Sequence, residues 1–273
     1  MRRLTILLIG LFLISIGCVA NSSSPDSTER AISYQYTCDF LMYNVQGKFQ
    51  SKMRIEAVHT RGLPGDMMLW NQASIAFGTS LDGEFNPPMK QPYMENFSYP
   101  VTQIKNMLTG EFYKGFPVTP IGFMMRNTVV DVHTFDVFTP FIDKLKLNQT
   151  TRCISNTMNM VLFENQGNQS LKNLDLTWTG NSQMNGNLCK VIHFQSSLDS
   201  VKVNLPESNF NIDGSTVFWG DIWVTPGNKQ IEYATLHEHS LFGSPDPEAK
   251  IKDVHSIYRT VTLQKINDTK PEN

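Results

Sequence analysis

The sequence predicts a mainly β protein: one large, curved antiparallel sheet, a half-barrel, with short helices inserted between its strands. From residue 33 onward, apolar and polar residues alternate with a period of two in several segments separated by turn residues. Helical spacing is clear only over residues 119–147. The composition shows no strong break along 273 residues, so we expect a single domain at 33–268.

The first two strands are predicted over residues 34–43 and 48–57. In each, every second residue is mostly apolar or aromatic and the residues between them are mostly polar, as on a strand with one buried and one solvated face. Residues 44–47 are rich in turn formers, which predicts a hairpin.

The middle of the chain interrupts this pattern. In 119–133, apolar residues recur at helical spacing behind Thr119, a suitable N-cap, and Pro120, a suitable first helical residue. Thr139 and Pro140 repeat the arrangement, so two short helices are expected. The stretch 80–100 is rich in Pro, Gly and Asn and predicts a long surface excursion.

Alternation returns in the second half and predicts further strands, for roughly eight or more in all. They are expected at 158–163, 174–178, 188–194, 217–224, 230–241 and 254–266, with 225–229 forming the turn of the clearest hairpin. Residues 269–273 are expected to be a tail.

The N-terminus is typical of an export signal. Arg2 and Arg3 precede an apolar run at 4–16 that is too short for a comfortable membrane span. We expect a signal peptide at 1–17 and a flexible polar tether at 18–32.

Two processing routes compete. Cleavage after Gly17 or Ala20 would give a freely secreted protein, whereas acylation of Cys18 would give a lipid-anchored one. Residues 15–18 resemble a bacterial lipobox, and together with the tether they favour lipidation of Cys18. The expected location is the cell envelope, facing the periplasm or the exterior.

Charge and cysteine content narrow the classes of partner. A net charge of −2 argues against nucleic acid as the main partner. Apart from Cys18, the chain has Cys38, Cys153 and Cys189, an odd number that permits at most one disulfide. Their pairing stays open, and buried thiols acting as small apolar residues are the simpler interpretation.

The lipobox-like stretch, the paired strands at 34–57, the apolar helix beginning at Thr119 and the hairpin at 221–236 resemble the superfamily of periplasmic lipoprotein carriers and lipid-binding lipoproteins of the Lol and LppX type. The resemblance implies a half-barrel whose apolar hollow takes acyl chains under inserted helices. It therefore suggests a binding or transfer module for lipid or an acylated ligand, without covalent chemistry or cofactor, and an envelope protein as a further partner. The expected ligand contacts are Phe40, Met53, Ile55, Ile121, Met124, Met125 and Val129.

Histidines suggest a separate metal site. His237 and His239 are two apart on a predicted strand, so both project to one face. A hairpin centred near Pro247 would set His255 opposite His239. The alternative is an ordinary polar sheet face.

Two further groups of polar and aromatic residues suggest possible sites. Asp221 lies between Trp219 and Trp223 on one strand face, where indoles and an acid suit a sugar ring, as in a secreted β-sandwich enzyme or carbohydrate-binding module. The simpler interpretation is a rim residue whose aromatic neighbours pack on the sheet. Asp131, His133 and Asp136 suit acid–base chemistry, but helix-end polarity is the simpler explanation of this group. No catalytic motif accompanies either group, so no enzyme is expected.

Overall fold

The protein is described by a computed structural model over residues 31–154, 158–162, 167–205, 210–243 and 255–266. Its strands form one fourteen-stranded sheet, and the named strand pairs are antiparallel. The main path runs β4-β3-β2-β1-β14-β13-β12-β10-β9-β6, and its two end strands are not paired with each other within the described residues. The predicted fold class, a large open antiparallel sheet with few helices, is confirmed.

The strands differ widely in length. They are β1 Ile32–Asn44, β2 Phe49–Leu63, β3 Met67–Gly78, β4 Met89–Lys90, β5 Phe97–Pro100, β6 Thr150–Ile154, β7 Met158–Leu162, β8 Gly167–Leu171, β9 Leu174–Met184, β10 Asn187–Ser196, β11 Asp199–Leu205, β12 Phe210–Val224, β13 Ile231–Gly243 and β14 His255–Lys265. Cys18, residues 18–30 of the tether, the tail and Pro247 lie outside the described residues.

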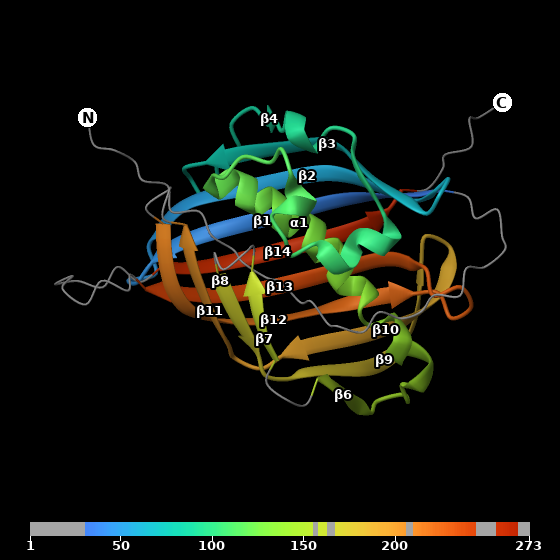
Figure 1. Cartoon of the computed structure of the whole chain (residues 1–273). Coiled ribbons are helices and arrows are strands. Elements are labelled where there is room, and N and C mark those ends of the chain that lie inside the picture. Colours follow the sequence, from blue (N-terminus) through green and yellow to red (C-terminus); the bar gives the residue numbers. More distant parts are fainter. Residues whose placement is uncertain (1–30, 155–157, 163–166, 206–209, 244–254, 267–273) are drawn as a thin grey trace, which may run out of the picture.

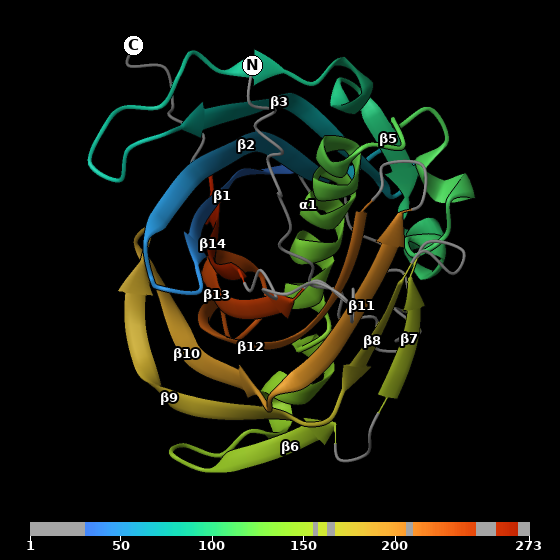
Figure 2. The same cartoon turned by 90° about the vertical axis from the view of Figure 1, so that its left-hand side faces the viewer.

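The sheet curves around α1 (Pro120–Asp136), the one α-helix of the described residues, which lies inside the curve (Figures 1 and 2). We call the side of the sheet that faces α1 the inner face and the opposite side the outer face. The sheet divides at β12, whose first half pairs with β11 and whose second half pairs with β10. Through β11 it continues to β8 and β7.

The predicted first hairpin is confirmed. β1 and β2 pair from Ile32↔Arg61 to Tyr43↔Phe49. The Asn44 side chain accepts hydrogen bonds from two backbone N–H groups of the turn, and Gly47 has a φ of 73°, a conformation that glycine adopts without steric cost. Turn chemistry and alternation therefore agree on the register.

Helix α1 begins as predicted. The Thr119 hydroxyl accepts a hydrogen bond from the Gly122 N–H at 3.2 Å, and Pro120 occupies the first turn. Gly122 lies so close to the preceding chain that a Cβ there would be 2.0 Å from the Pro117 carbonyl oxygen. Nearly all of α1 is buried, because the sheet flanks it and the 92–117 segment packs on it.

The second predicted helix differs from the prediction in its type and in its N-cap residue. Residues Thr139–Lys144 form the 3₁₀ helix η4, in which Phe138 holds the N-cap position and Thr139 lies inside the helix. Six residues leave room for little more than one turn, and such short segments commonly take 3₁₀ geometry.

Residues 59–117 contain more regular structure than the sequence indicated. β3 was not predicted because its alternation breaks at Gln72, which has a φ of 54°, and the β2–β3 register shifts twice. After β3 the chain forms β4 and β5 and three 3₁₀ helices: η1 Pro92–Met94, η2 Val101–Asn106 and η3 Glu111–Tyr113.

Candidate functional site

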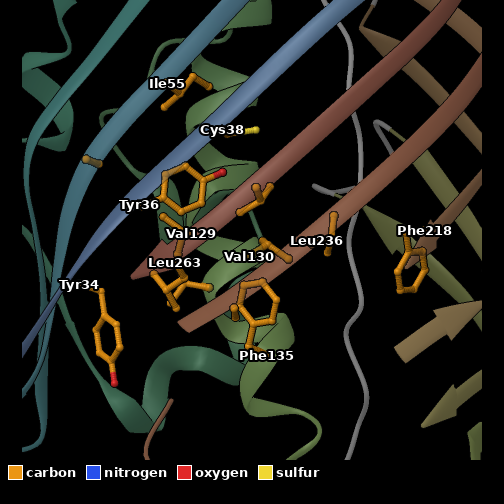
Figure 3. Packing of buried hydrophobic residues seen from close by; sticks show 14 of the residues in the cluster. Tyr34, Tyr36, Cys38, Ile55, Val129, Val130, Phe135, Phe218, Leu236 and Leu263 are labelled. Atoms are coloured by element: carbon orange, nitrogen blue, oxygen red, sulfur yellow. The ribbon is translucent and has the colours of Figure 1, made fainter. Parts of the chain in front are cut away.

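The predicted lipid contacts come together in one apolar interior. Phe40, Met53 and Ile55 lie on the inner face of β1 and β2 and are at most 2% exposed. Met124, Met125 and Val129 of α1 belong to the same buried cluster, and Ile121 is partly buried against it. Figure 3 shows part of this cluster, with Val129 and Val130 of α1 close to Tyr36 of β1 and Leu263 of β14. Helix α1 thus occupies the hollow of the sheet.

A buried ion cluster fixes α1 to the inner face. Arg259 of β14 donates two hydrogen bonds to the Asp131 carboxylate, at 2.8 and 3.0 Å, and a third to Glu238 of β13 at 2.7 Å. The Tyr36 hydroxyl donates to Asp131 at 2.7 Å. Glu238 also accepts from the hydroxyls of Thr216 and Ser240. Every charged atom in the cluster therefore has a partner.

Burial controls protonation in this cluster. One guanidinium serves two carboxyl groups, and burial raises the pKa of Glu238 to about 7 although Arg259 acts to lower it. Burial also raises the pKa of Asp131, with Arg259 and Tyr36 opposing. For the neighbouring Cys38, burial raises the pKa of the thiol, which makes it a poor nucleophile.

A second, partly buried cluster anchors the C-terminal end of α1. Arg61 of β2 donates to both oxygens of Asp136, at 2.7 and 3.1 Å. His133 bonds Asp136 through Nδ1 at 3.0 Å and Tyr99 through Nε2 at 2.8 Å. Burial acts to raise the pKa of Asp136, but Arg61 and His133 outweigh it and hold the pKa well below its ordinary value.

These contacts show how Asp131, His133 and Asp136, the group considered for acid–base chemistry, are arranged. Asp131 bonds Arg259 and Tyr36, whereas His133 bonds Asp136, so the three side chains do not form one acid–base relay. His133 and Asp136 belong to the last turn of α1, but Asp131 and His133 are buried at 0% and 2% exposure, so helix-end polarity does not account for all three residues. They hold the helix in the sheet.

An aromatic cap, residues 92–117, packs on α1. The Tyr113 hydroxyl donates to the Arg126 carbonyl at 3.2 Å, and Tyr99 reaches His133. Ring contacts link the cap internally, with Phe97 and Phe116 at 4.9 Å and Tyr99 and Phe112 at 4.9 Å between centroids. Several cap residues are only partly buried: Tyr93, Phe97, Val101, Ile104, Leu108 and Phe112.

The predicted histidine group does not assemble. His255 pairs with Phe242, and His239 pairs with Tyr258, so the proposed pairing of His255 with His239 is wrong. The β13–β14 register is shifted from a hairpin centred at Pro247. His239 instead stacks on Tyr258 at 4.3 Å. In the described part of the chain, no three metal-ligating side chains are grouped as a metal site.

The outer face carries a polar pocket of about 330 Å³. It opens where β6, β9 and β10 lie side by side. Its lining consists of Thr150, Asp175, Thr177, His193, Gln195, Ser196 and Ser197. Trp219 lies directly opposite Gln195 on β12, and Asp221 lies opposite His193. The sequence pattern indicated Trp219, Asp221 and Trp223 of β12 as a candidate site. It did not indicate the pocket residues of the neighbouring strands β9 and β10.

The inner-face residues that were missed carried a sequence signal. Arg259 shares its strand parity with Ile257 and Val261, and Glu238 shares its parity with Leu236, so both charges occupy positions that alternation assigns to the core. The cysteines agree with the simpler expectation: Cys38 and Cys189 are buried thiols, and the Cys153 thiol donates to the Leu174 carbonyl at 3.2 Å.

No family model matches the chain, and no curated protein matches it. One similar solved structure is described as "Lipid-protein interactions in lipovitellin", with a TM-score of 0.41 and 10% identity. The similarity covers 87% of this chain and 25% of that one. Helices of the described residues are too short or too polar to cross a membrane.

Proposed function

We propose that the protein is a non-enzymatic lipid-binding module that takes an acyl chain into its apolar interior at the aromatic cap. The observation that carries this proposal is the continuous apolar cluster, which extends from the inner face of the sheet through α1 to the partly buried side chains of the cap. Each buried methylene group of a ligand would contribute about 0.8 kcal/mol.

The cap is a better entry than α1. If α1 left the hollow, Arg259 would lose its Asp131 partner, and an unpaired buried charge costs several kcal/mol. The partly buried Arg61 would also lose Asp136. The cap consists of short 3₁₀ helices and one four-residue strand, whose backbone is held by few regular hydrogen bonds. We therefore propose that the cap, rather than α1, moves to admit the ligand.

The proposal extends to location. Acylation of Cys18 would tether the domain to a membrane of the cell envelope, close to a source of lipid and to an envelope protein partner. Cleavage after Ala20 would give the same binding domain in secreted form. Mass measurement of the mature N-terminus distinguishes the two.

Binding is tested by expressing the full chain with its own export segment and recording native mass spectra of the purified protein, followed by lipid extraction. A fluorescent C16 fatty acid then serves as a probe for titration. We expect co-purified lipid, saturable probe binding, and at least tenfold weaker binding for Phe112→Asp, because a charge would enter the apolar cap.

The matched control is Leu241→Asp, which places the same charge at a residue that is 45% exposed on the outer face. It should leave probe binding unchanged. A folded protein that carries no lipid and does not bind the probe contradicts the proposal, as does equal weakening by the two substitutions.

A further inference from the structure

We propose that the pocket on the outer face binds a neutral sugar ring, with Trp219 as the stacking platform. This site lies on the side of the sheet opposite the apolar interior, and it does not depend on the lipid proposal. Its volume of about 330 Å³ lies at the small end of the roughly 300–1,000 Å³ range of ligand pockets, which suits a compact ligand.

The pocket offers both donors and acceptors. β6 contributes the hydroxyl of Thr150, and β9 contributes Asp175 and the hydroxyl of Thr177. β10 contributes His193 and Gln195. Gln195 supplies an amide that can donate and accept at once. Adjacent sugar hydroxyls need this mixture, because each one donates one hydrogen bond and accepts others.

The charges of the site are internally compensated, which favours an uncharged ligand. Arg152 directs its Nε and one terminal nitrogen to the two oxygens of Asp175, at 2.8 and 3.1 Å. His193 Nδ1 lies 3.1 Å from Asp221. A phosphate or carboxylate ligand would have to break one of these pairs, whereas hydroxyl groups can use the remaining lone pairs of both carboxylates.

Trp219 provides the apolar surface that a sugar ring requires. Its indole is 36% exposed, lies opposite the pocket residue Gln195, and is supported by a stacked His237 at 5.9 Å between centroids and 27° between planes. A ring held in this way presents its face without first losing side-chain freedom. The sheet thus combines a platform with polar groups along one edge.

Trp223 belongs to the same strand face but not to the site. It lies opposite Val191, which does not line the pocket, and its ring packs edge-on against Tyr233 at 5.3 Å. Trp219 and Asp221 do not line the pocket themselves, but each lies directly opposite a lining residue of β10. The proposed site therefore keeps Trp219 and Asp221 beside the pocket and adds the lining residues of β9 and β10. Trp223 becomes a matched control: the same residue type, strand and face, two residues away.

The test is to screen the full mature chain against an array of neutral and acidic glycans and to titrate the best neutral glycan by calorimetry. We expect binding to neutral sugars, a loss of at least tenfold in affinity for Trp219→Ala, and a change of less than twofold for Trp223→Ala. Asp221→Asn preserves the side-chain shape and is expected to weaken binding at least threefold. Fatty-acid binding should be unchanged in all three variants.

Three results overturn the proposal: no binding to any neutral glycan, selective binding to acidic glycans, or equal weakening by Trp219→Ala and Trp223→Ala. Near-ultraviolet circular dichroism of each variant separates loss of binding from loss of fold. If Trp219→Ala does not fold, Asp221→Asn alone decides, and unchanged affinity in that variant overturns the assignment.

Discussion

The two faces of the sheet carry the same kind of ion pair in opposite surroundings. On the inner face, Arg259 forms an ion pair with Asp131, and both side chains are 1% exposed. On the outer face, Arg54 grips Asp39 through two hydrogen bonds of 2.7 and 2.8 Å, but the two side chains are 39% and 35% exposed. The geometry is nearly equal, so any difference in effect comes from burial and from what each pair connects.

The connections differ as much as the burial. Asp39 and Arg54 are direct cross-strand neighbours in a hairpin whose register the backbone already fixes. Asp131 and Arg259 are 128 residues apart and join a helix to the sheet. The inner pair therefore fixes the position of α1 on the sheet. The outer pair joins two strands that the backbone hydrogen bonds of the hairpin already hold together.

The largest effect is expected from Arg259→Met. This change leaves Asp131 and Glu238 buried without their cation, and breaking a buried pair by removing one partner costs about 3–5 kcal/mol. Urea unfolding followed by tryptophan fluorescence would measure the loss in unfolding free energy. A loss below 1 kcal/mol would mean that the inner cluster does not hold α1.

Alternation alone predicted the parts of the fold in which each residue keeps its side. The β1–β2 hairpin was predicted because its alternation and turn residues agree. β3 was missed because Gln72 adopts a left-handed conformation and switches the side chains that follow to the other face. The division of β12 between two partners has no local signal at all, since it depends on which strands compete for its edges.

The site was predicted to a similar extent. Six of the seven apolar residues assigned to a lipid site share one buried cluster and Ile121 packs against it, because helical and strand periodicities both identify inward faces. Arg259 was visible only as a charge at a core position, and its partner Asp131 cannot be found without the topology. The outer pocket likewise requires β9, β10 and β12 to be adjacent before its residues form a group.

The next effect is a pH dependence that belongs to the inner face. The pKa of Glu238 is raised to about 7 in the folded protein from 4.5, so its contribution to stability is fully present below pH 4.5 and is lost as the pH rises to 7. The raised pKa of Asp131 makes the protein less stable in the same direction, as the pH rises. Burial lowers the pKa values of His59 and His133, so their contribution to stability is lost in the opposite direction, as the pH falls.

Comparison of the native chain with Glu238→Gln isolates the glutamate from these other groups. Between pH 4.5 and 7.5, the native protein should lose on the order of 1–3 kcal/mol relative to the variant. Urea unfolding at four pH values across this window provides the measurement. Parallel stability profiles for the two proteins would show that Glu238 ionises as readily in the folded state as in the unfolded one.

The smallest effect is expected from Arg54→Met on the outer face. Exposed ion pairs contribute about 0.2–1 kcal/mol, because water solvates both charges when the pair is broken. The Arg54 guanidinium also lies over the Phe85 ring at 4.9 Å, and the methionine side chain keeps part of that apolar contact.

Salt dependence distinguishes the two ion pairs further. The cost of Arg54→Met in unfolding free energy should fall toward zero in 1 M NaCl, where the screening length is about 3 Å, whereas the cost of Arg259→Met should persist. Urea unfolding of both variants at low and high salt measures this, and an equal salt response would mean that solvent reaches the two faces alike.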